Sequence, residues 1–271
     1  MFECVVNVSE GREREVLDQL ALVCGRTLRD LHRDRDHHRS VFTLIDEAPA
    51  LILAVRALVD ACFARLDLRY HEGVHPRFGV VDVVPFVALD PDQRHIARAL
   101  RDETGHWISD TYDVPVFFYG PLNTAQRTLP EVRRLAFGSL APDAGPGEPS
   151  ARLGAVAVGE RPLLLAWNLW LSGTSTERAR ALASTVRQGA VRALGLRVGD
   201  LVQVSCNLID PLNVGPNTVY DEVARHLGAG ERIDHAELVG LAPRAVLESL
   251  DPSRWRALGL SEATTIEAHI A

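Results

Sequence analysis

The segment HEGVHPRFG carries two histidines at a spacing that can bind zinc. His71 and His75 form an H-E-x-x-H pattern, which on a helix places both imidazoles on one face and leaves the intervening glutamate as a base. However, Gly73 lies between the histidines and Pro76 follows the second one, and a proline pushes the preceding residue away from helical angles. The sequence therefore disfavours a zinc-protease helix, and a metal-dependent hydrolase that uses His71 and His75 remains only an alternative.

His75 is also suited to proton transfer. An imidazole titrates near neutral pH, and the proline that follows restricts its movement. The apolar run FGVVDVVPFVAL begins at Phe78, so the histidine should lie in a loop ahead of a buried strand. From the residues alone two interpretations stay open: His75 acts as a general base, or it only caps the turn.

Composition excludes several classes of chemistry and partner. The 271-residue chain contains no lysine, so its 29 basic residues are all arginines, which excludes a lysine Schiff base, a pyridoxal-phosphate lysine and a P-loop lysine. The cysteines form no C-x-x-C pair and should be core residues. A formal net charge of -7 argues against nucleic-acid and anionic-membrane partners. Because no apolar run could span a membrane and no secretion signal is evident, we expect a cytoplasmic protein.

The order of apolar runs predicts two successive α/β units. In the first, strands are expected at 3–8, 40–45, 78–89 and 114–120, helices at 13–28, 50–66 and 128–136, and the end of a further helix at 101–113. In the second, strands are expected at 162–171, 201–209 and 235–241, and helices at 175–194, 217–228 and 242–250. The predicted fold class is therefore α/β, an α+β sandwich of two ferredoxin-like subdomains, 1–160 and 161–271, each a sheet covered by helices.

The stretch GSLAPDAGPGEPSARLG, residues 138–154, interrupts this pattern. It is rich in glycine, proline and small polar residues, which favour turns over regular elements. Long irregular loops within compact chains are often functional. We therefore treat this loop as a candidate part of a binding site.

Several segments resemble one known family in order and spacing over essentially the whole chain. They are ECVVNVSEGR near the start, DHHRSVFTL, YHEGVHPRFGVVDVVPFV, PDAGP, VSCNLID and LVGLAP. Together they are similar to the glutamate formiminotransferase (formimidoyltransferase) domain, which is the N-terminal part of formiminotransferase-cyclodeaminase. The GxHPRxGxxDxxPF pattern is the most specific of these matches. The resemblance does not extend to the cyclodeaminase domain.

The resemblance implies a folate-dependent one-carbon transferase. Family members move a formimino group, and some a formyl group, between tetrahydrofolate and glutamate or a related amine. The histidine of the family's HPR motif, treated as the catalytic base, falls on His75. The implied cosubstrate is a tetrahydrofolate derivative, with no metal, and the small-molecule partners are a reduced folate and an amine such as glutamate. Relatives commonly form homodimers, and folate lies in a groove between the two subdomains.

The resemblance and the chemistry of the side chains nominate further binding residues. Arginine forks grip carboxylates with two hydrogen bonds, so Arg39 and Arg77 are candidates for holding glutamate or the folate tail. Arg77, next to a proline, could instead only brace its loop. The other candidates for substrate or folate binding are Asn7 and Glu10 after the first strand, Asp143, Gly145, Pro146 and Gly154 in the glycine-rich loop, and Asn207 in the second subdomain.

Four positions depart from the family pattern. Val74 replaces a glutamate before the motif histidine, His38 replaces an asparagine, His32 replaces an aspartate and Leu153 replaces an aromatic residue. A carboxylate beside the histidine would raise its pKa and orient it, so its loss favours a weaker base or a different acceptor. A catalytically inactive or repurposed folate-binding paralogue is therefore the second hypothesis.

The histidines of HRDRDHHRS also allow a metal interpretation. His32, His37 and His38 alternate with aspartates in a polar segment. Histidines and aspartates in such a segment are more often solvated than bound to metal. We therefore expect no metal.

Overall fold

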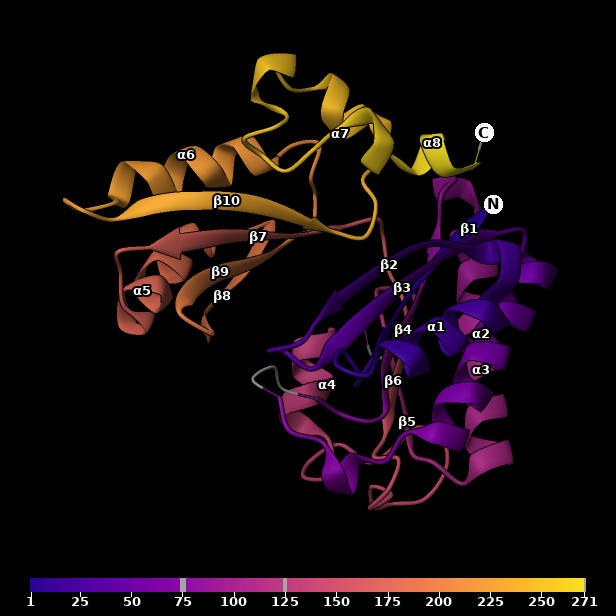
Figure 1. Cartoon of the computed structure of the whole chain (residues 1–271). Coiled ribbons are helices and arrows are strands. Elements are labelled where there is room, and N and C mark those ends of the chain that lie inside the picture. Colours follow the sequence, from indigo (N-terminus) through magenta and orange to yellow (C-terminus); the bar gives the residue numbers. More distant parts are fainter. Residues whose placement is uncertain (74–76, 124–125, 271) are drawn as a thin grey trace. The chain divides into compact units, whose positions relative to one another are not determined.

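The computed structural model describes residues 1–73, 77–123 and 126–270. Its chain forms two compact units, Met1–Pro162 and Leu163–Ala271, which are coloured indigo to magenta and orange to yellow in Figure 1. None of the helices in the described ranges is long and apolar enough to cross a membrane.

The first unit is built on a six-stranded sheet in the order β2-β3-β1-β4-β6-β5. Its strands are β1 (Phe2–Val8), β2 (Leu28–Asp34), β3 (Arg39–Asp46), β4 (Val81–Ala88), β5 (Val116–Tyr119) and β6 (Val156–Glu160). The first four pair antiparallel, whereas β6 runs parallel to both β4 and β5. The first four strands with their two helices form a ferredoxin-like βαββαβ unit, which β6 and β5 extend at the β4 edge.

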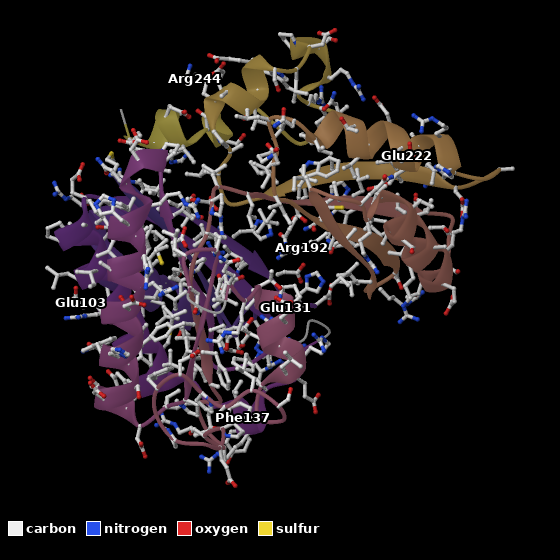
Figure 2. The ribbon with its side chains drawn as sticks, turned by 180° about the vertical axis from the view of Figure 1, so that it is seen from behind. Glu103, Glu131, Phe137, Arg192, Glu222 and Arg244 are labelled. Carbon is white, nitrogen blue, oxygen red and sulfur yellow. The ribbon has the colours of Figure 1, made fainter. Side chains whose placement is uncertain are left out.

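Helices cover both faces of this sheet. They are α1 (Arg14–Cys24), α2 (Ala48–Arg65), α3 (Arg94–Tyr112) and α4 (Leu129–Leu135), with short 3-10 turns at Gly25–Thr27, Leu68–Tyr70 and Pro91–Gln93. Alternate residues of a strand point to opposite faces: Phe118 packs into the large core under α1, α2 and α3, and Phe117 into the smaller core under α4. Figure 2 shows Glu103 on α3 and Glu131 on α4, on the two sides of the sheet.

The second unit repeats the βαββαβ pattern. Its strands β7 (Leu165–Ser172), β8 (Val191–Val198), β9 (Leu201–Leu208) and β10 (Arg232–Val239) form an antiparallel sheet in the order β10-β7-β9-β8. The helices are α5 (Thr176–Val186), α6 (Pro216–His226), α7 (Arg244–Glu248) and α8 (Ile266–Ile270), with 3-10 turns at Pro252–Arg254 and Glu262–Thr264. The predicted fold class, two helix-covered sheets of ferredoxin-like topology, is confirmed.

Only one face of the second sheet carries the apolar core of this unit. Leu165, Trp167, Leu169 and Leu171 alternate along β7 and are fully buried in that core. The Trp167 indole Nε1 donates a hydrogen bond to the Leu258 carbonyl at 2.8 Å. The intervening positions on the other face are mostly polar, and include Asn168, Gln203, Ser205, Asn207 and Glu237.

The predicted helix over 175–194 is wrong in its second half. The helix α5 ends at Val186, and the strand β8 occupies Val191–Val198. Gly189 has a positive φ of 50°, a conformation that suits glycine and turns the chain. A Cβ on Gly195 would lie 2.3 Å from the backbone nitrogen of Arg180, so this glycine is what lets the strand pack directly under α5. The strands β2 and β6 were not predicted from the sequence.

Because the two faces of the second sheet differ in burial, two leucine substitutions should change stability by very different amounts. Leu169 is fully buried, whereas Leu194 on β8 is 48% exposed on the other face. Leu169→Ala should lower the free energy of unfolding by about 2–5 kcal/mol, because it leaves a cavity in a packed core. Leu194→Ala should change it by less than about 0.5 kcal/mol. Urea unfolding followed by tryptophan fluorescence measures both, and equal losses would contradict the assignment of the core face.

Candidate active site

A buried carboxylate organises the face of the first sheet that α4 covers. Asp82 on β4 is fully buried, and its carboxylate accepts hydrogen bonds from Arg39 Nη1 on β3 at 2.7 Å and from Arg133 Nη2 on α4 at 2.6 Å. The backbone N–H of Phe78 donates to the second carboxylate oxygen at 2.6 Å. Burial alone would raise the pKa of Asp82, but the two guanidinium charges and these hydrogen bonds hold it below its ordinary value.

Asn7 extends this cluster to the first strand. Its side-chain oxygen accepts hydrogen bonds from Arg39 Nε at 3.0 Å and from Arg39 Nη2 at 2.8 Å. The predicted binding residues Asn7 and Arg39 are therefore in direct contact, and Arg39 is oriented by both Asn7 and Asp82. Two arginines against one aspartate leave the group Asn7, Arg39, Asp82 and Arg133, here called the arginine–aspartate cluster, with an excess of positive charge.

Glu10 forms a second polar group with two histidines. Its carboxylate accepts hydrogen bonds from the backbone N–H groups of Arg12 at 2.6 Å and Glu13 at 3.0 Å, and lies 3.2 Å from His38 Nε2. Burial would raise the pKa of Glu10, but these N–H groups and the His38 charge lower it below its ordinary value. Glu10 is therefore an ionised carboxylate.

His38 links Glu10 to the motif segment. Its Nδ1 lies 2.8 Å from the carbonyl oxygen of Glu72, and its Nε2 faces the Glu10 carboxylate. Both partners accept hydrogen bonds, so the His38 ring is held between a backbone carbonyl and a carboxylate. The His38 backbone has a positive φ of 50°, a region in which histidine and asparagine are both enriched.

His71 stacks on His38 and is held neutral. The two ring centroids lie 3.9 Å apart with an interplanar angle of 12°, and His71 Nε2 donates to the His38 carbonyl at 2.9 Å. Burial and the neighbouring His38 charge lower the pKa of His71 from 6.5 to about 4. Its Nδ1 is buried and has no hydrogen-bond partner within the described ranges.

Arg77, at the C-terminal end of the motif segment, hydrogen-bonds back to its N-terminal end. Its Nη1 donates to the His71 carbonyl at 3.0 Å and its Nη2 donates to the Gly73 carbonyl at 2.6 Å. A Cβ on Gly73 would lie 2.5 Å from the His37 carbonyl oxygen, so glycine lets this segment lie against the turn between β2 and β3. Residues 71–73 and 77 are not helical. His75, with Val74 and Pro76, lies outside the described residues.

The glycine-rich loop packs against the strand that follows the motif. Gly154 has a positive φ of 75°, and a Cβ there would lie 2.5 Å from the Phe78 carbonyl oxygen. Backbone hydrogen bonds join Val80 N–H to Leu153 O at 2.9 Å and Ala155 N–H to Phe78 O at 3.0 Å. The loop is thereby fixed beside the residues that follow His75.

The other predicted loop residues lie nearer to α3. Gly145 has a φ of 84°, and a Cβ there would lie 2.7 Å from the Val114 carbonyl oxygen. Pro146 follows it and is partly exposed. The Asp143 carboxylate accepts hydrogen bonds from Arg127 Nη2 at 2.6 and 2.7 Å and from the Phe118 N–H at 2.7 Å.

Asn207 belongs to the second unit. It is exposed near the end of β9, where its register partners are Ala166 on β7 and Arg192 on β8. It lies on the mostly polar face of that sheet, the face opposite the apolar core of its unit.

Asp82 and Arg133 were not among the site residues predicted from the sequence. Asp82 gave a signal, because it is the one charged residue within the apolar run that follows the HPR motif. Arg133 gave none, since its role depends on how α4 packs. No three histidine, cysteine, aspartate or glutamate side chains in the described ranges are grouped so that they could hold a metal ion.

Comparison with known proteins places the chain in a family. Residues 1–161 match the family described as the formiminotransferase domain, N-terminal subdomain. The chain therefore belongs to the formiminotransferase family, as its motifs predicted.

Named relatives cover nearly all of the chain. It is 29% identical to the glutamate formimidoyltransferase of Thermoplasma acidophilum over 98% of this chain and 96% of that protein. The corresponding protein of Streptococcus pyogenes is also 29% identical, over 91% and 90%. The formimidoyltransferase-cyclodeaminase of Dictyostelium discoideum is 29% identical over 93% of this chain, which spans about half (52%) of that relative's length. The predicted enzyme class, a glutamate formimidoyltransferase-like transferase, is confirmed at the level of the family.

The arginine–aspartate cluster predicts a large loss of stability for Asp82→Asn. Removing the carboxylate takes the Asp82 counter-charge away from two partly buried guanidinium groups, which should cost about 3–5 kcal/mol of unfolding free energy. Asp18→Asn, at an exposed i,i+4 pair with Arg14, should have almost no effect. Chemical denaturation at neutral pH measures both changes. A loss at Asp82 no larger than at Asp18 would refute the role of the cluster.

The pH dependence of stability should reflect the same carboxylate. Because folding lowers the pKa of Asp82 from 3.8, its contribution is present above pH 3.8 and is lost as the pH falls through the lowered folded value. The unfolding free energy of Asp82→Asn should therefore fall less steeply with acidification than that of the wild type. Parallel slopes below pH 4 would contradict this assignment.

His71 should titrate far below an ordinary histidine. Its folded pKa of about 4, against 6.5, means that the folded protein resists its protonation, so stability is lost as the pH falls from 6.5 to 4. Nitrogen NMR of protein labelled at its histidine rings should show His71 neutral at pH 6, with the proton on Nε2. The spectrum of His71→Gln assigns the signal. A midpoint near 6.5 would show that the stacked arrangement is wrong.

Proposed function

We propose that this protein moves a formimino group, or a formyl group, between a tetrahydrofolate derivative and glutamate or a related amine. The observation that carries the proposal is the similarity to two separate proteins named glutamate formimidoyltransferase, each covered over at least 90% of its own length. The HPR segment, the most specific of the family motifs, is present at His75.

In this proposal His75 is the general base. The amine of glutamate is a poor nucleophile while protonated, so a base must accept its proton as the nitrogen attacks the formimino carbon. A carbon–nitrogen bond forms to glutamate, and the bond to folate N5 then breaks. The imidazolium of His75 returns the proton to N5, which leaves with its electron pair. The histidine ends the cycle unprotonated.

The described residues around the motif support a role in binding anions. The arginine–aspartate cluster has excess positive charge, and Arg39 is held in place by Asn7 and Asp82. Such a fixed guanidinium attracts the carboxylates of glutamate or of the folate tail. We propose that Arg77 contributes by bracing the motif segment through its bonds to the carbonyls of His71 and Gly73, and that this bracing positions His75.

Folate binding is proposed for the loop and for the second unit. The segment from Gly145 to Gly154 corresponds to the family's glycine-rich folate contact, with Asp143 and Pro146 at its start, and Asn207 is exposed on a sheet face lined mostly by polar residues. This part of the proposal depends on the resemblance and on the exposure of Asn207.

One observation favours a second function. The His38 Nε2 lies 3.2 Å from the Glu10 carboxylate, at the position where the family has asparagine. Glu10 therefore already has a polar side-chain partner within the protein. A folate-binding paralogue that uses another acceptor, or has lost turnover, is the alternative that this contact supports.

Incubation with 5-formiminotetrahydrofolate and glutamate tests the proposal. We expect consumption of the formimino group, and we expect His75→Ala to lower kcat about a hundredfold or more, as is usual when a general base is lost. His95→Ala, at an exposed position on α3, is the matched control and should retain the wild-type rate.

The outcomes separate the hypotheses. Folate binding without turnover supports the paralogue. Turnover that survives His75→Ala at full rate rejects His75 as the base. Stoichiometric zinc in the purified protein that is lost in His71→Ala would instead support the metal-dependent hydrolase.

A further inference from the structure

A pocket of about 530 Å³ lies at the edge of the first sheet, on the face covered by α3. Its lining includes Arg98, Arg101 and His106 of α3, Phe118 of β5, and Arg127 and Asp143 from the segments after β5. Phe118 packs on the helix side of the sheet, whereas Val83 and Phe117 pack with α4 on the side of the arginine–aspartate cluster. The pocket therefore lies on the opposite side of the sheet from that cluster.

Arg101 is a buried cation with unused hydrogen-bonding capacity. Only 3% of the residue is exposed, yet it lines the pocket. Its Nε and Nη2 donate to one oxygen of Asp102 at 2.8 and 2.5 Å, and its guanidinium carbon lies 5.2 Å from the centre of the Phe118 ring. Its Nη1 is buried and makes no hydrogen bond to any residue of the described ranges.

Arg127, also in the pocket lining, has a buried donor without a hydrogen-bond partner among the described residues as well. Its side chain is 14% exposed and its Nη2 grips both oxygens of Asp143. Its Nε is buried and finds no partner among residues 1–73, 77–123 and 126–270. A buried donor without a partner is destabilising, so an arginine retained only to brace α3 against β5 would be expected to have all its donors satisfied.

The charges of the lining favour an anion. Arg98, Arg101 and Arg127 outnumber Asp102 and Asp143, which leaves an excess positive charge beside two unsatisfied guanidinium N–H groups. Guanidinium forks match the oxygens of carboxylates and phosphates. The volume is in the range of small-molecule sites and exceeds what one oxyanion needs.

We propose that this pocket binds a small organic anion through a terminal oxyanion group, a carboxylate or a phosphate, that accepts hydrogen bonds from Arg101 Nη1 and Arg127 Nε. The Phe118 ring lies beside the group, and the half-exposed Arg98 completes the positive rim. The pocket shares Asp143 with the loop that is proposed to contact folate, whereas the transfer chemistry is proposed at His75, so the formimino-transfer assay and the anion titration can fail independently.

Isothermal titration calorimetry of the full chain with glutarate and with inorganic phosphate tests the site. We expect saturable binding of at least one probe, weakening as ionic strength rises. Arg127→Gln and Arg101→Met should each weaken it about tenfold or more, since each removes a charge-assisted hydrogen bond. Binding of glutarate alone assigns a carboxylate ligand, and binding of phosphate alone assigns a phosphate ester.

A variant outside the pocket and a check of folding serve as controls. Arg26→Gln removes an 86% exposed arginine that does not line the pocket and should leave affinity unchanged. Circular dichroism checks the fold of each variant, and Arg127→Gln alone decides the test if Arg101→Met does not fold. Absence of saturable binding of both probes to the wild type overturns the proposal, as does an affinity that Arg127→Gln does not change.

Discussion

The ion pairs of Asp82 are the constraint on which the first unit depends. A fully buried carboxylate is costly unless it is paired and hydrogen-bonded, and Asp82 meets both conditions through Arg39, Arg133 and the N–H of Phe78. These partners come from β3, α4 and the chain just ahead of β4. Asp82 therefore joins elements that are far apart in the sequence, and its arginine partners bring positive charge to one face of the sheet.

The same interactions fix the ends of the HPR segment. Phe78, three positions after His75, is tied to Asp82, while Arg77 donates to the carbonyls of His71 and Gly73. Before the motif, the ring of His38 in the β2–β3 turn stacks on the ring of His71 in this segment. Each of the two rings also hydrogen-bonds to a backbone carbonyl of the other segment. The proposed role of His75 as a base requires such support from neighbouring residues, and we propose that these charges and carbonyls at the two ends of the segment supply it.

The sequence predicted those features of the backbone that depend on neighbouring residues in the chain. Gly73 and Pro76 indicated that the H-E-x-x-H pattern is not helical, and the described residues of that segment are irregular. The helix expected over 175–194 failed because apolar spacing alone did not reveal that Gly189 ends one element and that β8 begins at Val191. The pairing of Asp82 with Arg133 spans 51 positions and depends on tertiary packing, as does the stacking of His38 on His71, so neither follows from sequence patterns.

The departures from the family pattern change charge in one direction. Val74 lacks the carboxylate that the family has before the motif histidine, and His38 places an imidazole where the family has an asparagine. The His38 ring lies 3.2 Å from the Glu10 carboxylate, so the larger change in charge is the missing carboxylate. Within the proposed function, surroundings that have lost a negative charge while retaining Arg39, Arg77 and Arg133 favour anionic acceptors. Within that proposal, an acceptor that carries a carboxylate, such as glutamate or another amino acid, is favoured over an amine without one.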